Sequence, residues 1–391
     1  MTKPRVVLIT RRFWPLVGGA EIIMGRLAAE LHRRGLSTTL LTAHWQRDWP
    51  REIEHHGVRV IRLANPSRRF WGTARYMRGV AGWLRSHRQA FDLVYVSMLK
   101  HDAYAAIGEG RRGKFPVVLR AEGAGLSGDC HWQLDARCGL RIKRRCLQAD
   151  AFVAPSPAIE RELIAAGYPR PRIHYLPNGV AIPPPRDAAA RLEARAALAE
   201  IDPALWLDAD APLAVYTGRL HDMKGLEYLI SAWPDVLKRR PQARLWLVGE
   251  GAFRPRLTEL IGNLGFHGRV LLTGAFDDVE DFLVAADLFV LPSLEEGMSL
   301  ALLEAMARGL PVVATKIPAN EVLVQDGQNG RLVPTRDPNA LAAAVLELCD
   351  HAEQAARLGE RARCRVSEEF SLDKMADDHL VLFERLLNSP R

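Results

Sequence analysis

Short, continuously apolar runs alternate along this chain with longer segments in which apolar residues recur at helical spacing. This alternation is typical of α/β proteins, in which crossover helices join parallel strands. In the first half the strand-like runs are residues 6–10, 38–42, 58–63, 93–96, 117–120, 151–154 and 173–176. In the second half they are residues 213–217, 244–248, 270–273, 288–291, 311–314 and 330–333. We therefore expect two doubly wound domains, each built on a parallel sheet.

The alternation is interrupted in the segment Leu-Pro-Asn-Gly-Val-Ala-Ile-Pro-Pro-Pro, residues 176–185. Two turn-forming residues and a run of prolines break both the strand and the helix periodicity there. This segment is the predicted linker between a domain at 1–180 and a domain at 181–371. The final segment, 372–391, has a helical pattern as far as residue 387.

The charged residues divide the chain at the same place. Residues 1–180 contain 30 Lys and Arg against 14 Asp and Glu, whereas the remainder contains 23 against 32. A basic first half suggests contact with a polyanion, either an anionic membrane surface, a phosphate-bearing acceptor or nucleic acid. A high arginine background is the alternative, but it leaves the acidic second half unexplained. Nucleic acid is disfavoured because no aromatic residues are interleaved on the strands.

The start of the chain and its apolar runs bear on location. No run approaches the roughly 18 apolar residues that a membrane span requires. The basic first residues lead directly into the strand at 6–10, without a cleavage-type segment. The expected location is therefore cytoplasmic, with the basic half as a possible contact to the inner face of the membrane.

The segment 292–307 carries two carboxylates eight positions apart, Glu296 and Glu304. The buried strand expected at 288–291 ends at a proline, and Ser299 is the predicted N-cap of the helix that follows. Glu296, with the amides of Gly297, Met298 and Ser299, then lies at the carboxyl end of a strand beside a helix N-terminus. Anionic ligands bind at such places in α/β folds. Glu304 points back toward the same ligand.

Two cations follow the first strand of the second half. Arg219 and Lys224 occur in Thr-Gly-Arg-Leu-His-Asp-Met-Lys-Gly, residues 217–225. Charge-assisted hydrogen bonds from such side chains bind phosphate strongly. A solvated basic turn is the alternative.

These segments resemble the motifs of the retaining glycosyltransferases of family 4. Residues 296–304 match the E-x7-E motif of the family, and residues 218–225 match its G-R-L-x-x-x-K-G. The resemblance covers nearly the whole chain and implies a GT-B fold, two Rossmann-like domains whose parallel sheets face an interdomain cleft. It also implies that the last helix crosses back to the first domain.

The resemblance also implies roles for single residues. By position, Glu296 contacts the donor sugar, Glu304 contacts the ribose, and Arg219 and Lys224 hold the departing diphosphate. Further donor contacts are implied for Gly18, Gly19, Gly249, Gly274, Gly297, Met298 and Ser299. Gly18 and Gly19 do not form the G-x-G-x-x-G of a dinucleotide site, and a plain glycine turn is their alternative.

The chain departs from the family on the acceptor side. Many members have a His just after the strand that is here 117–120, whereas this chain has Glu122 near that place. A carboxylate there can orient or deprotonate an acceptor hydroxyl. It can equally form a structural ion pair with Arg120. His101 is a second acceptor-side candidate.

Three other features allow two interpretations each. Residues 68–85 have an apolar stripe beside Arg68, Arg75, Arg78 and Arg85, which suits an interfacial helix on anionic lipid or an ordinary core helix. The basic cluster at 141–145 would extend a membrane patch. Asp208-Ala209-Asp210 resembles a metal-binding D-x-D, but it precedes a strand instead of following one, so we interpret it as a polar turn.

The expected function is retaining transfer of a sugar from a nucleotide-diphosphate sugar to a hydroxyl acceptor. The acceptor would be a saccharide or a lipid-linked saccharide in cell-surface polysaccharide or glycolipid biosynthesis. No metal and no further cofactor is expected, because Arg219, Lys224 and helix-start amides would carry the leaving-group charge. The alternatives are a nucleotide-sugar epimerase or a sugar phosphorylase of the same fold, or a non-catalytic basic membrane-binding protein.

Overall fold

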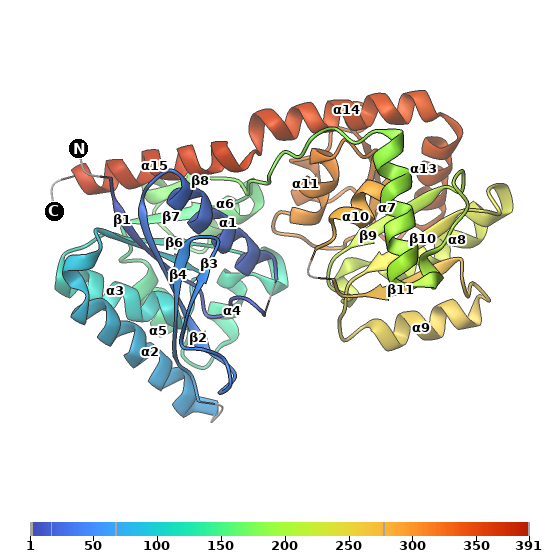
Figure 1. Cartoon of the computed structure of the whole chain (residues 1–391). Coiled ribbons are helices and arrows are strands. Elements are labelled where there is room, and N and C mark those ends of the chain that lie inside the picture. The colour runs from blue at the N-terminus through green and yellow to red at the C-terminus, as the bar shows by residue number, and fades with distance from the viewer. Residues whose placement is uncertain (1–2, 17, 67–68, 277, 390–391) are drawn as a thin grey trace. The chain divides into compact units, whose positions relative to one another are not determined.

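The computed structural model describes residues 3–16, 18–66, 69–276 and 278–389. The chain forms two compact units (Figure 1). The first unit comprises Met1–Gly179 and Leu372–Arg391, and the second comprises Val180–Ser371. Among the described residues, no helix combines the length and the apolar character that a membrane span needs.

The first unit is built on a sheet with the strand order β3-β4-β2-β1-β5-β6-β7-β8. These strands are β1 (Arg5–Ile9), β2 (Ser37–His44), β3 (Glu52–His55), β4 (Val58–Ala64), β5 (Leu93–Ser97), β6 (Val117–Arg120), β7 (Ala151–Ala154) and β8 (Ile173–Tyr175). From β1 the chain builds outward to β2 and β4, then returns to β5 and builds in the other direction. The topological switch point therefore lies between β1 and β5, where doubly wound sheets bind ligands.

The strand predictions for the first half missed one strand, β3, at an edge of the otherwise parallel sheet. Strand β3 pairs antiparallel with β4. Its sequence, Glu-Ile-Glu-His, alternates polar and apolar residues and none of them is fully buried. An exposed edge strand needs no continuous apolar run, which is why the pattern that predicts the buried strands does not reveal β3.

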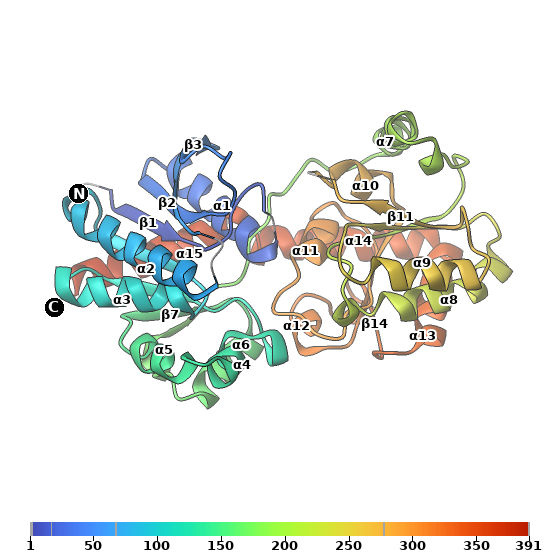
Figure 2. The ribbon, with the colours of Figure 1, turned by 90° about the horizontal axis from the view of Figure 1, so that it is seen from below.

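Helices cover both faces of this sheet. They are α1 (Gly19–Arg33), α2 (Arg69–Ser86), α3 (His101–Gly113), α4 (Asp129–Asp135), α5 (Gly139–Cys146), α6 (Pro157–Ala165) and α15 (Leu372–Asn388). Helices α2 and α3 pack side by side on one face (Figure 2). Helix α15 packs beside α1 on the other (Figure 1). The last helix is thus part of the first unit, where its buried His379 lies 2.9 Å from the Tyr95 hydroxyl.

The burial of its apolar residues shows that helix α2 is an ordinary core helix. Tyr76, Val80 and Leu84 are fully buried in the core of the first unit, and Met77 packs against that core. The stripe therefore faces the protein interior, as in an ordinary core helix. Arg75, Arg78 and Arg85 are exposed, and Arg68 lies outside the described residues.

The second unit has a parallel sheet with the order β11-β10-β9-β12-β13-β14. Its strands are β9 (Leu213–Thr217), β10 (Arg244–Val248), β11 (Val270–Gly274), β12 (Leu288–Leu291), β13 (Val312–Thr315) and β14 (Arg331–Val333). The switch point lies between β9 and β12, which pair directly. The loops that leave the carboxyl ends of these two strands are the ones that carry Arg219, Lys224 and Glu296.

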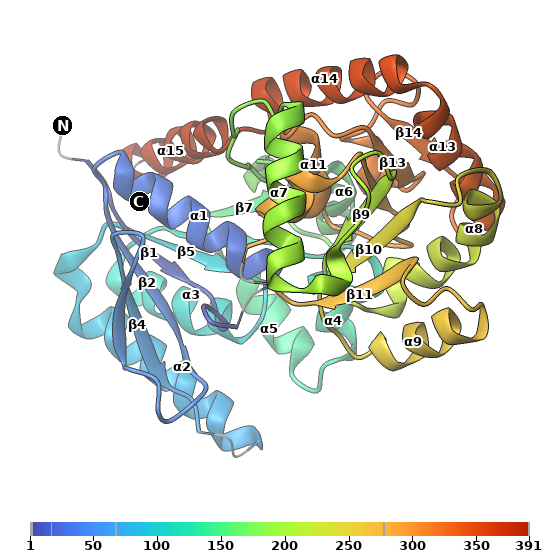
Figure 3. The same cartoon turned by 45° about the vertical axis from the view of Figure 1, so that its right-hand side comes forward.

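Helices pack on both faces of this second sheet as well. They are α7 (Ala188–Ile201), α8 (Leu226–Arg239), α9 (Arg254–Asn263), α10 (Glu280–Ala285), α11 (Leu300–Ala307), α12 (Pro318–Glu321), α13 (Pro338–Asp350) and α14 (Ala352–Glu369). Helix α8 packs beside α13, and α14 packs beside α11 (Figure 3). Trp233 of α8 and Trp246 of β10 are the largest fully buried side chains. The Trp246 ring packs edge-on against Phe282 of α10, with the centroids 5.9 Å apart.

Candidate active site

The loops after β9 and β12 touch one another in the second unit. Gly225 has a positive φ of 62°, and a Cβ built on it would lie 2.2 Å from the carbonyl oxygen of Pro292. The Leu294 amide donates to the carbonyl oxygen of Met223 at 2.8 Å. Only glycine allows so close an approach of the two backbones. The sequence therefore holds the Arg219–Lys224 segment against the start of the E-x7-E segment.

Lys224 and Glu296 form an ion pair at this contact. Lys224 Nζ lies 2.5 Å from Glu296 Oε1, and the side chains retain 19% and 9% of their exposure. The same carboxylate oxygen accepts a 2.7 Å hydrogen bond from the Ser293 hydroxyl. The pair thus joins residues 72 positions apart at the switch point of the sheet.

Ser293 is not among the predicted site residues, although it lies within the segment 292–307. Its side chain is fully buried. Its carbonyl oxygen accepts from the Thr315 hydroxyl at 2.5 Å, and the Asn320 amide group donates to the Thr315 carbonyl at 2.9 Å. This chain of buried polar groups fixes the turn that presents Glu296. No sequence pattern distinguishes Ser293 from other serines in turns.

Tyr216 is a second residue that the sequence did not single out. It is fully buried at the end of β9, and its hydroxyl donates to the carbonyl oxygen of Arg219 at 2.9 Å. Burial, and then the nearby Glu296 carboxylate, raise the pKa of Tyr216 well above its ordinary value. Tyr216 therefore stays neutral and supports the backbone of Arg219, whose own side chain is exposed.

The predicted glycines Gly249 and Gly274 lie together at the carboxyl ends of β10 and β11. The Gly249 amide donates to the Gly274 carbonyl oxygen at 2.7 Å. Gly249 has φ 145°, and a Cβ on it would lie 1.9 Å from the carbonyl oxygen of Gly218. The backbones of three strand ends thus meet beside Arg219, and no side chain fits between them.

Helix α11 begins as predicted. Ser299 is its N-cap, and the Ser299 hydroxyl accepts from the Leu302 amide at 3.3 Å. Ser299 and the preceding Met298 are buried, whereas Gly297 is half-buried. Glu304 lies near the middle of α11, is half-buried, and takes part in a polar interaction. The predicted donor residues 296–304 thus follow one strand end and the helix that leaves it.

The turn at Gly18 and Gly19 starts helix α1 in the first unit. Gly18 is the N-cap residue, and its carbonyl oxygen accepts from the Ile22 amide at 3.0 Å. A Cβ on Gly18 would lie 2.6 Å from Glu21 Oε2, whereas a Cβ on Gly19 would meet nothing within 4 Å. A Cβ at position 18 would require only the carboxylate end of Glu21 to shift, and a Cβ at position 19 would meet no neighbour, so packing requires glycine at neither position.

On the acceptor side, Glu122 is paired with Arg120. Glu122 Oε1 accepts from Arg120 Nε and from the Ser97 hydroxyl, each at 2.9 Å. Arg120 is fully buried and also donates to the Asn178 side chain. Burial raises the pKa of Glu122 to about 7 although the Arg120 charge opposes this. The structural ion pair that the sequence allowed is present, and Glu122 remains able to exchange a proton near neutral pH.

His101 is the first residue of α3 and is half-buried. Its ring lies edge-on to Trp132, with the centroids 5.3 Å apart. Burial, with help from the charges of Arg11 and Lys100, lowers the pKa of His101 to about 4. Its neutral imidazole is therefore the form present at neutral pH.

Glu122 and the start of α3 are connected through Asp129. The Glu122 amide donates to Asp129 Oδ2 at 3.0 Å, and Lys100 Nζ lies 3.6 Å from Asp129 Oδ1. Glu122 follows β6, and Lys100 and His101 follow β5, which is the neighbouring strand. The structure therefore brings the acceptor-side candidates to one region of the first sheet's carboxyl edge.

The D-x-D sequence lies away from these groups. Asp208 to Asp210 precede β9, and the Ala211 amide donates to the Asp208 carbonyl oxygen at 3.0 Å. Arg195 Nη1 donates to the carbonyl oxygens of residues 208, 209 and 211. The interpretation as a polar turn is confirmed. It lies at the amino end of β9, opposite the end that carries Arg219.

Two doubly wound units of this kind are the architecture of the GT-B glycosyltransferases, and the comparisons agree. Residues 18–179 match the family model described as glycosyl transferase 4-like domain, and residues 211–351 match that of the glycosyl transferases group 1. The D-inositol 3-phosphate glycosyltransferase of Streptomyces coelicolor is 30% identical over 81% of this chain and 68% of its own length. The chain belongs to the group 1 glycosyltransferases, family 4.

Other relatives match over a shorter range. The lipopolysaccharide core biosynthesis glycosyltransferase LpsE of Rhizobium meliloti is 36% identical over 44% of this chain and 50% of its own length. The chain thus spans about half the length of the first curated relatives that it matches.

Solved structures share the fold over almost the full chain. Sucrose-phosphate synthase from Thermosynechococcus elongatus has a TM-score of 0.82 at 24% identity, over 98% of this chain and 99% of that one. Alr3699/HepE from Anabaena, in complex with UDP and glucose, has a TM-score of 0.78 at 21% identity, over 97% of this chain and 99% of that one.

Proposed function

We propose that the protein is a retaining glycosyltransferase that moves a sugar from a nucleotide-diphosphate sugar to a hydroxyl group of a saccharide or lipid-linked acceptor. The observation that carries this proposal is the contact between Lys224 and Glu296, which sets a cation and a carboxylate at the switch point of the second sheet. A sugar diphosphate needs both, because its phosphates bind cations and its hydroxyls donate to carboxylates.

Four residues of the second unit have proposed roles in this reaction. Arg219 and Lys224 hold the diphosphate and stabilise the negative charge that grows as it departs. Lys224 has three N–H donors, so it can bond a phosphate oxygen while it keeps Glu296. Glu296 accepts hydrogen bonds from sugar hydroxyls, and Glu304 accepts from the ribose. Two side-chain cations suffice for this charge, and the proposal includes no metal ion.

In the proposed reaction, the bond between the anomeric carbon and the diphosphate oxygen breaks. A bond between the same carbon and the acceptor oxygen forms on the same face of the sugar, which retains the configuration. The proton of the acceptor hydroxyl passes to the departing diphosphate. The growing negative charge on that diphosphate is greatest when the bond is nearly broken, and this is where Arg219 and Lys224 contribute most.

The first unit would orient the acceptor. Glu122 and the neutral His101 are the groups there that can accept a hydrogen bond from a hydroxyl. Because Arg120 and Ser97 occupy one oxygen of Glu122, its other oxygen is the proposed acceptor contact. Arg120 acts through Glu122 and is a positioning residue.

The relatives support the choice of substrates. One relative is a lipopolysaccharide core biosynthesis glycosyltransferase, another is a D-inositol 3-phosphate glycosyltransferase, and the HepE structure is in complex with UDP and glucose. We accordingly propose a nucleotide-sugar donor and an acceptor that belongs to cell-surface polysaccharide or glycolipid biosynthesis.

A peripheral contact with an anionic membrane is part of the proposal, and specific side chains support it. Leu126, Leu134 and Leu140 are among the most exposed large apolar residues, at 72%, 64% and 56%. Arg141 and Arg144, on the helix that begins beside Leu140, are exposed as well. Apolar and cationic side chains on one segment suit an anionic lipid surface, such as the inner face of the cell membrane.

The test begins with a donor screen. Thermal unfolding of the full chain is measured with UDP-, GDP- and ADP-sugars, and one of these should raise the melting temperature in a saturable way. That donor is then incubated with saccharide and lipid-linked acceptors. Arg219→Gln should abolish both the shift and the transfer, whereas Arg239→Gln on the surface of α8 should preserve both.

Other outcomes would contradict the proposal in distinguishable ways. A requirement for free phosphate as the co-substrate would define a phosphorylase, and conversion of the donor without an acceptor would define an epimerase. Binding of anionic vesicles without any donor binding would leave the membrane contact as the function.

A further inference from the structure

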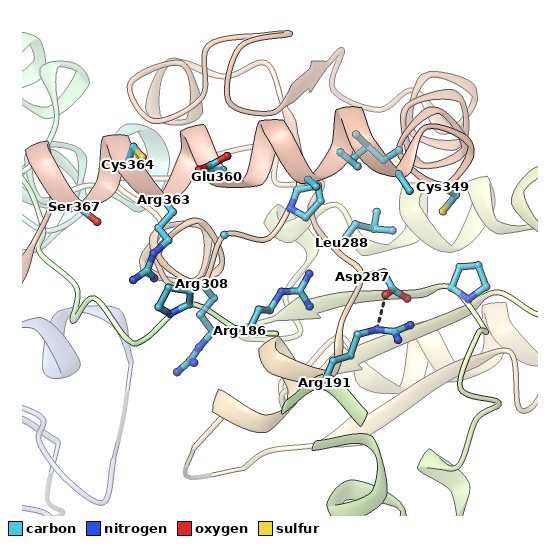
Figure 4. Close-up of a pocket in the computed structure, with 18 of the residues that line it drawn as sticks. Arg186, Arg191, Asp287, Leu288, Arg308, Cys349, Glu360, Arg363, Cys364 and Ser367 are labelled. Atoms are coloured by element: carbon cyan, nitrogen blue, oxygen red, sulfur yellow. Dashed lines mark hydrogen bonds and ion pairs between the residues drawn. The ribbon is translucent and has the colours of Figure 1, made fainter. Parts of the chain in front are cut away.

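A cavity of about 890 Å³ lies at the amino ends of the strands of the second unit (Figure 4). Pro212, Asp287 and Pro311, which precede β9, β12 and β13, line it. The Lys224–Glu296 pair follows the carboxyl ends of β9 and β12, so the cavity and the candidate active site lie at opposite edges of the same sheet. A volume of this size accommodates a small organic ligand.

Arg186 and Arg363 line the cavity, and some of their N–H groups make no hydrogen bond to the described residues. Arg186 donates through Nη1 to the carbonyl oxygens of Val284 and Ala286, and Arg363 donates through Nη1 to that of Ala307. Within the described part of the chain, Nε and Nη2 of both guanidinium groups make no hydrogen bond. Neither arginine forms an ion pair with a carboxylate there. Both side chains are only partly exposed.

The other charged groups of the lining are already engaged or are solvated. Asp287 is held by Arg191 at 2.8 Å and by Arg195 at 2.9 Å. Arg308 lies 2.7 Å from Glu280. Asp210, Glu360 and Glu368 are exposed, so water screens their charge. The unneutralised positive charge of the cavity therefore resides on the partly buried Arg186 and Arg363.

The two arginines reach the cavity from different elements. Arg363 and Glu360 extend from α14, and Arg186 comes from the segment before α7, across the cavity from that helix (Figure 4). The lining also includes apolar side chains, among them Leu288, Leu348 and Ala355. A ligand that suits this wall has an anionic group for the guanidiniums, hydroxyl groups for Glu360 and a compact body.

We propose that this cavity is a second binding site, separate from the donor site, for a phosphomonoester of a sugar or polyol. The planar guanidinium is the side chain best suited to phosphate, because its N–H groups match phosphate oxygens in pairs. Arg186 and Arg363 bind the phosphate, and Glu360 accepts from a hydroxyl. Burial lowers the pKa of Arg186 to about 10, so it remains charged at neutral pH and gains from an anionic neighbour.

A purely structural role would explain the same carbonyl contacts. Arg186 bonds the carbonyls at the end of α10, and Arg363 bonds the last residue of α11. Replacement of either arginine alone would not separate the two explanations, since both predict a change. A substitution that adds charge to the cavity and removes no arginine contact does separate them.

Ser367 lines the cavity on α14 and provides this substitution. Ser367→Asp places a negative charge beside the proposed phosphate, and Ser367→Asn is the neutral control of similar size. Titration calorimetry of the full chain with glucose 1-phosphate should show saturable binding that Ser367→Asp weakens about tenfold or more and Ser367→Asn leaves unchanged. Arg363→Gln should weaken it by a similar factor.

Two further probes complete the experiment. Glucose without phosphate should not bind. Inorganic phosphate should bind more weakly than glucose 1-phosphate and should respond to Ser367→Asp in the same direction. Equal affinity of the two phosphates would overturn the assignment to a sugar or polyol ester, and binding that ignores Ser367→Asp would overturn the site.

The donor site is a competing location for a sugar phosphate, and Lys224→Met controls for it. Binding lost in Lys224→Met but kept in Ser367→Asp would place the ligand at the donor site and overturn the inference. This inference does not rest on the proposed function, because its readout is binding and not transfer. A failure of one therefore leaves the other standing.

Discussion

The ion pairs Lys224–Glu296 and Arg120–Glu122 both lie at the carboxyl end of a sheet, and they differ in access to solvent. In the second unit, Lys224 retains 19% of its side-chain exposure and its ammonium bonds Glu296. In the first unit, Arg120 retains 1% and is tied to both Glu122 and Asn178. Lys224–Glu296 lies at the switch point between β9 and β12, whereas Arg120–Glu122 follows β6, one strand away from the switch point between β1 and β5. Of the two cations, Lys224 is the one that a ligand can still reach.

This difference assigns the pairs to different tasks. A partly exposed lysine can add a phosphate to its contacts with little structural cost. A fully buried arginine cannot change partners without leaving a charge unpaired, which is expensive in the interior. Lys224 is therefore suited to ligand binding, whereas Arg120 is suited to holding Glu122 and the loop after β6. The variants below test this division.

Removal of Arg120 should have the largest effect on stability. Arg120→Met leaves Glu122 buried without its cation, and we expect the free energy of unfolding to fall by about 3–5 kcal/mol. Urea unfolding of the full chain, followed by circular dichroism, measures the change. Arg111→Met on the surface of α3 is the control and should change it by less than about 0.5 kcal/mol.

The double variant Arg120→Met/Glu122→Met refines this test. It removes both charges and should recover much of the lost stability, since apolar replacement of a buried pair is often neutral. If Arg120→Met alone were as stable as the wild type, the buried pair would not hold the loop, and the contrast with Lys224–Glu296 would fail.

Removal of Lys224 should reduce activity far more than stability, in contrast to removal of Arg120. Lys224→Met deletes one of two cations proposed to stabilise the departing diphosphate, so kcat/KM should fall about 10²- to 10³-fold. Its melting temperature should fall less than that of Arg120→Met, because Lys224 is partly exposed and Glu296 keeps its hydrogen bond from Ser293. Steady-state transfer kinetics and thermal unfolding on the same samples measure both.

Lys238→Met, on the exposed face of α8, is the matched control and should affect neither quantity. A strong loss of stability in Lys224→Met without a loss of transfer would reverse the roles of the two pairs.

The two sites also differ in how far the sequence predicts them. The buried strands are predictable because a strand covered on both faces is continuously apolar. Arg219, Lys224 and Glu296 are predictable because they directly follow such strands. The contact between Lys224 and Glu296 is not, since it depends on β9 and β12 being neighbours, and sheet order is set by the packing of the whole unit.

On the acceptor side, local sequence was informative only at short range. The pairing of Glu122 with Arg120 was one of two interpretations, because the residues are two positions apart. The burial of Glu122 and its hydrogen bonds to Ser97 and Asp129 depend on segments that are brought together only by the fold. The edge strand β3 and the buried Ser293 were missed for a related reason. An exposed edge has no apolar run, and a serine in a turn has no pattern that distinguishes it.

Glu122 should make the stability of the protein depend on pH. Burial raises the pKa of Glu122 to about 7, from an ordinary value of 4.5. A carboxyl with a higher pKa in the folded protein binds its proton more tightly when folded. Folding is therefore favoured below pH 4.5, and this contribution is lost as the pH rises to 7, by up to about 1.4 kcal/mol per pH unit.

Glu122→Gln removes this titration. The free energy of unfolding of both proteins is measured with urea between pH 5 and 7.5. As the pH rises, the wild type should lose stability relative to Glu122→Gln. The buried Asp102, whose pKa burial also raises to about 7, titrates in both proteins, so it cancels in the difference. Parallel pH profiles for the two proteins would contradict an elevated pKa at Glu122.

The smallest expected effect tests whether Ser293 positions Glu296. Ser293→Ala removes the 2.7 Å hydrogen bond to Glu296 Oε1 and keeps the bond from Lys224. A neutral hydrogen bond contributes about 0.5–1.5 kcal/mol, so kcat/KM should fall about two- to tenfold. Because Glu296 is proposed to contact the donor sugar, the loss should appear in the donor KM and leave the acceptor KM unchanged. A merely structural role would change the melting temperature and both KM values together. Ser231→Ala on the exposed face of α8 is the control, and equal effects of the two substitutions would show that the hydroxyl of Ser293 does not orient the carboxylate.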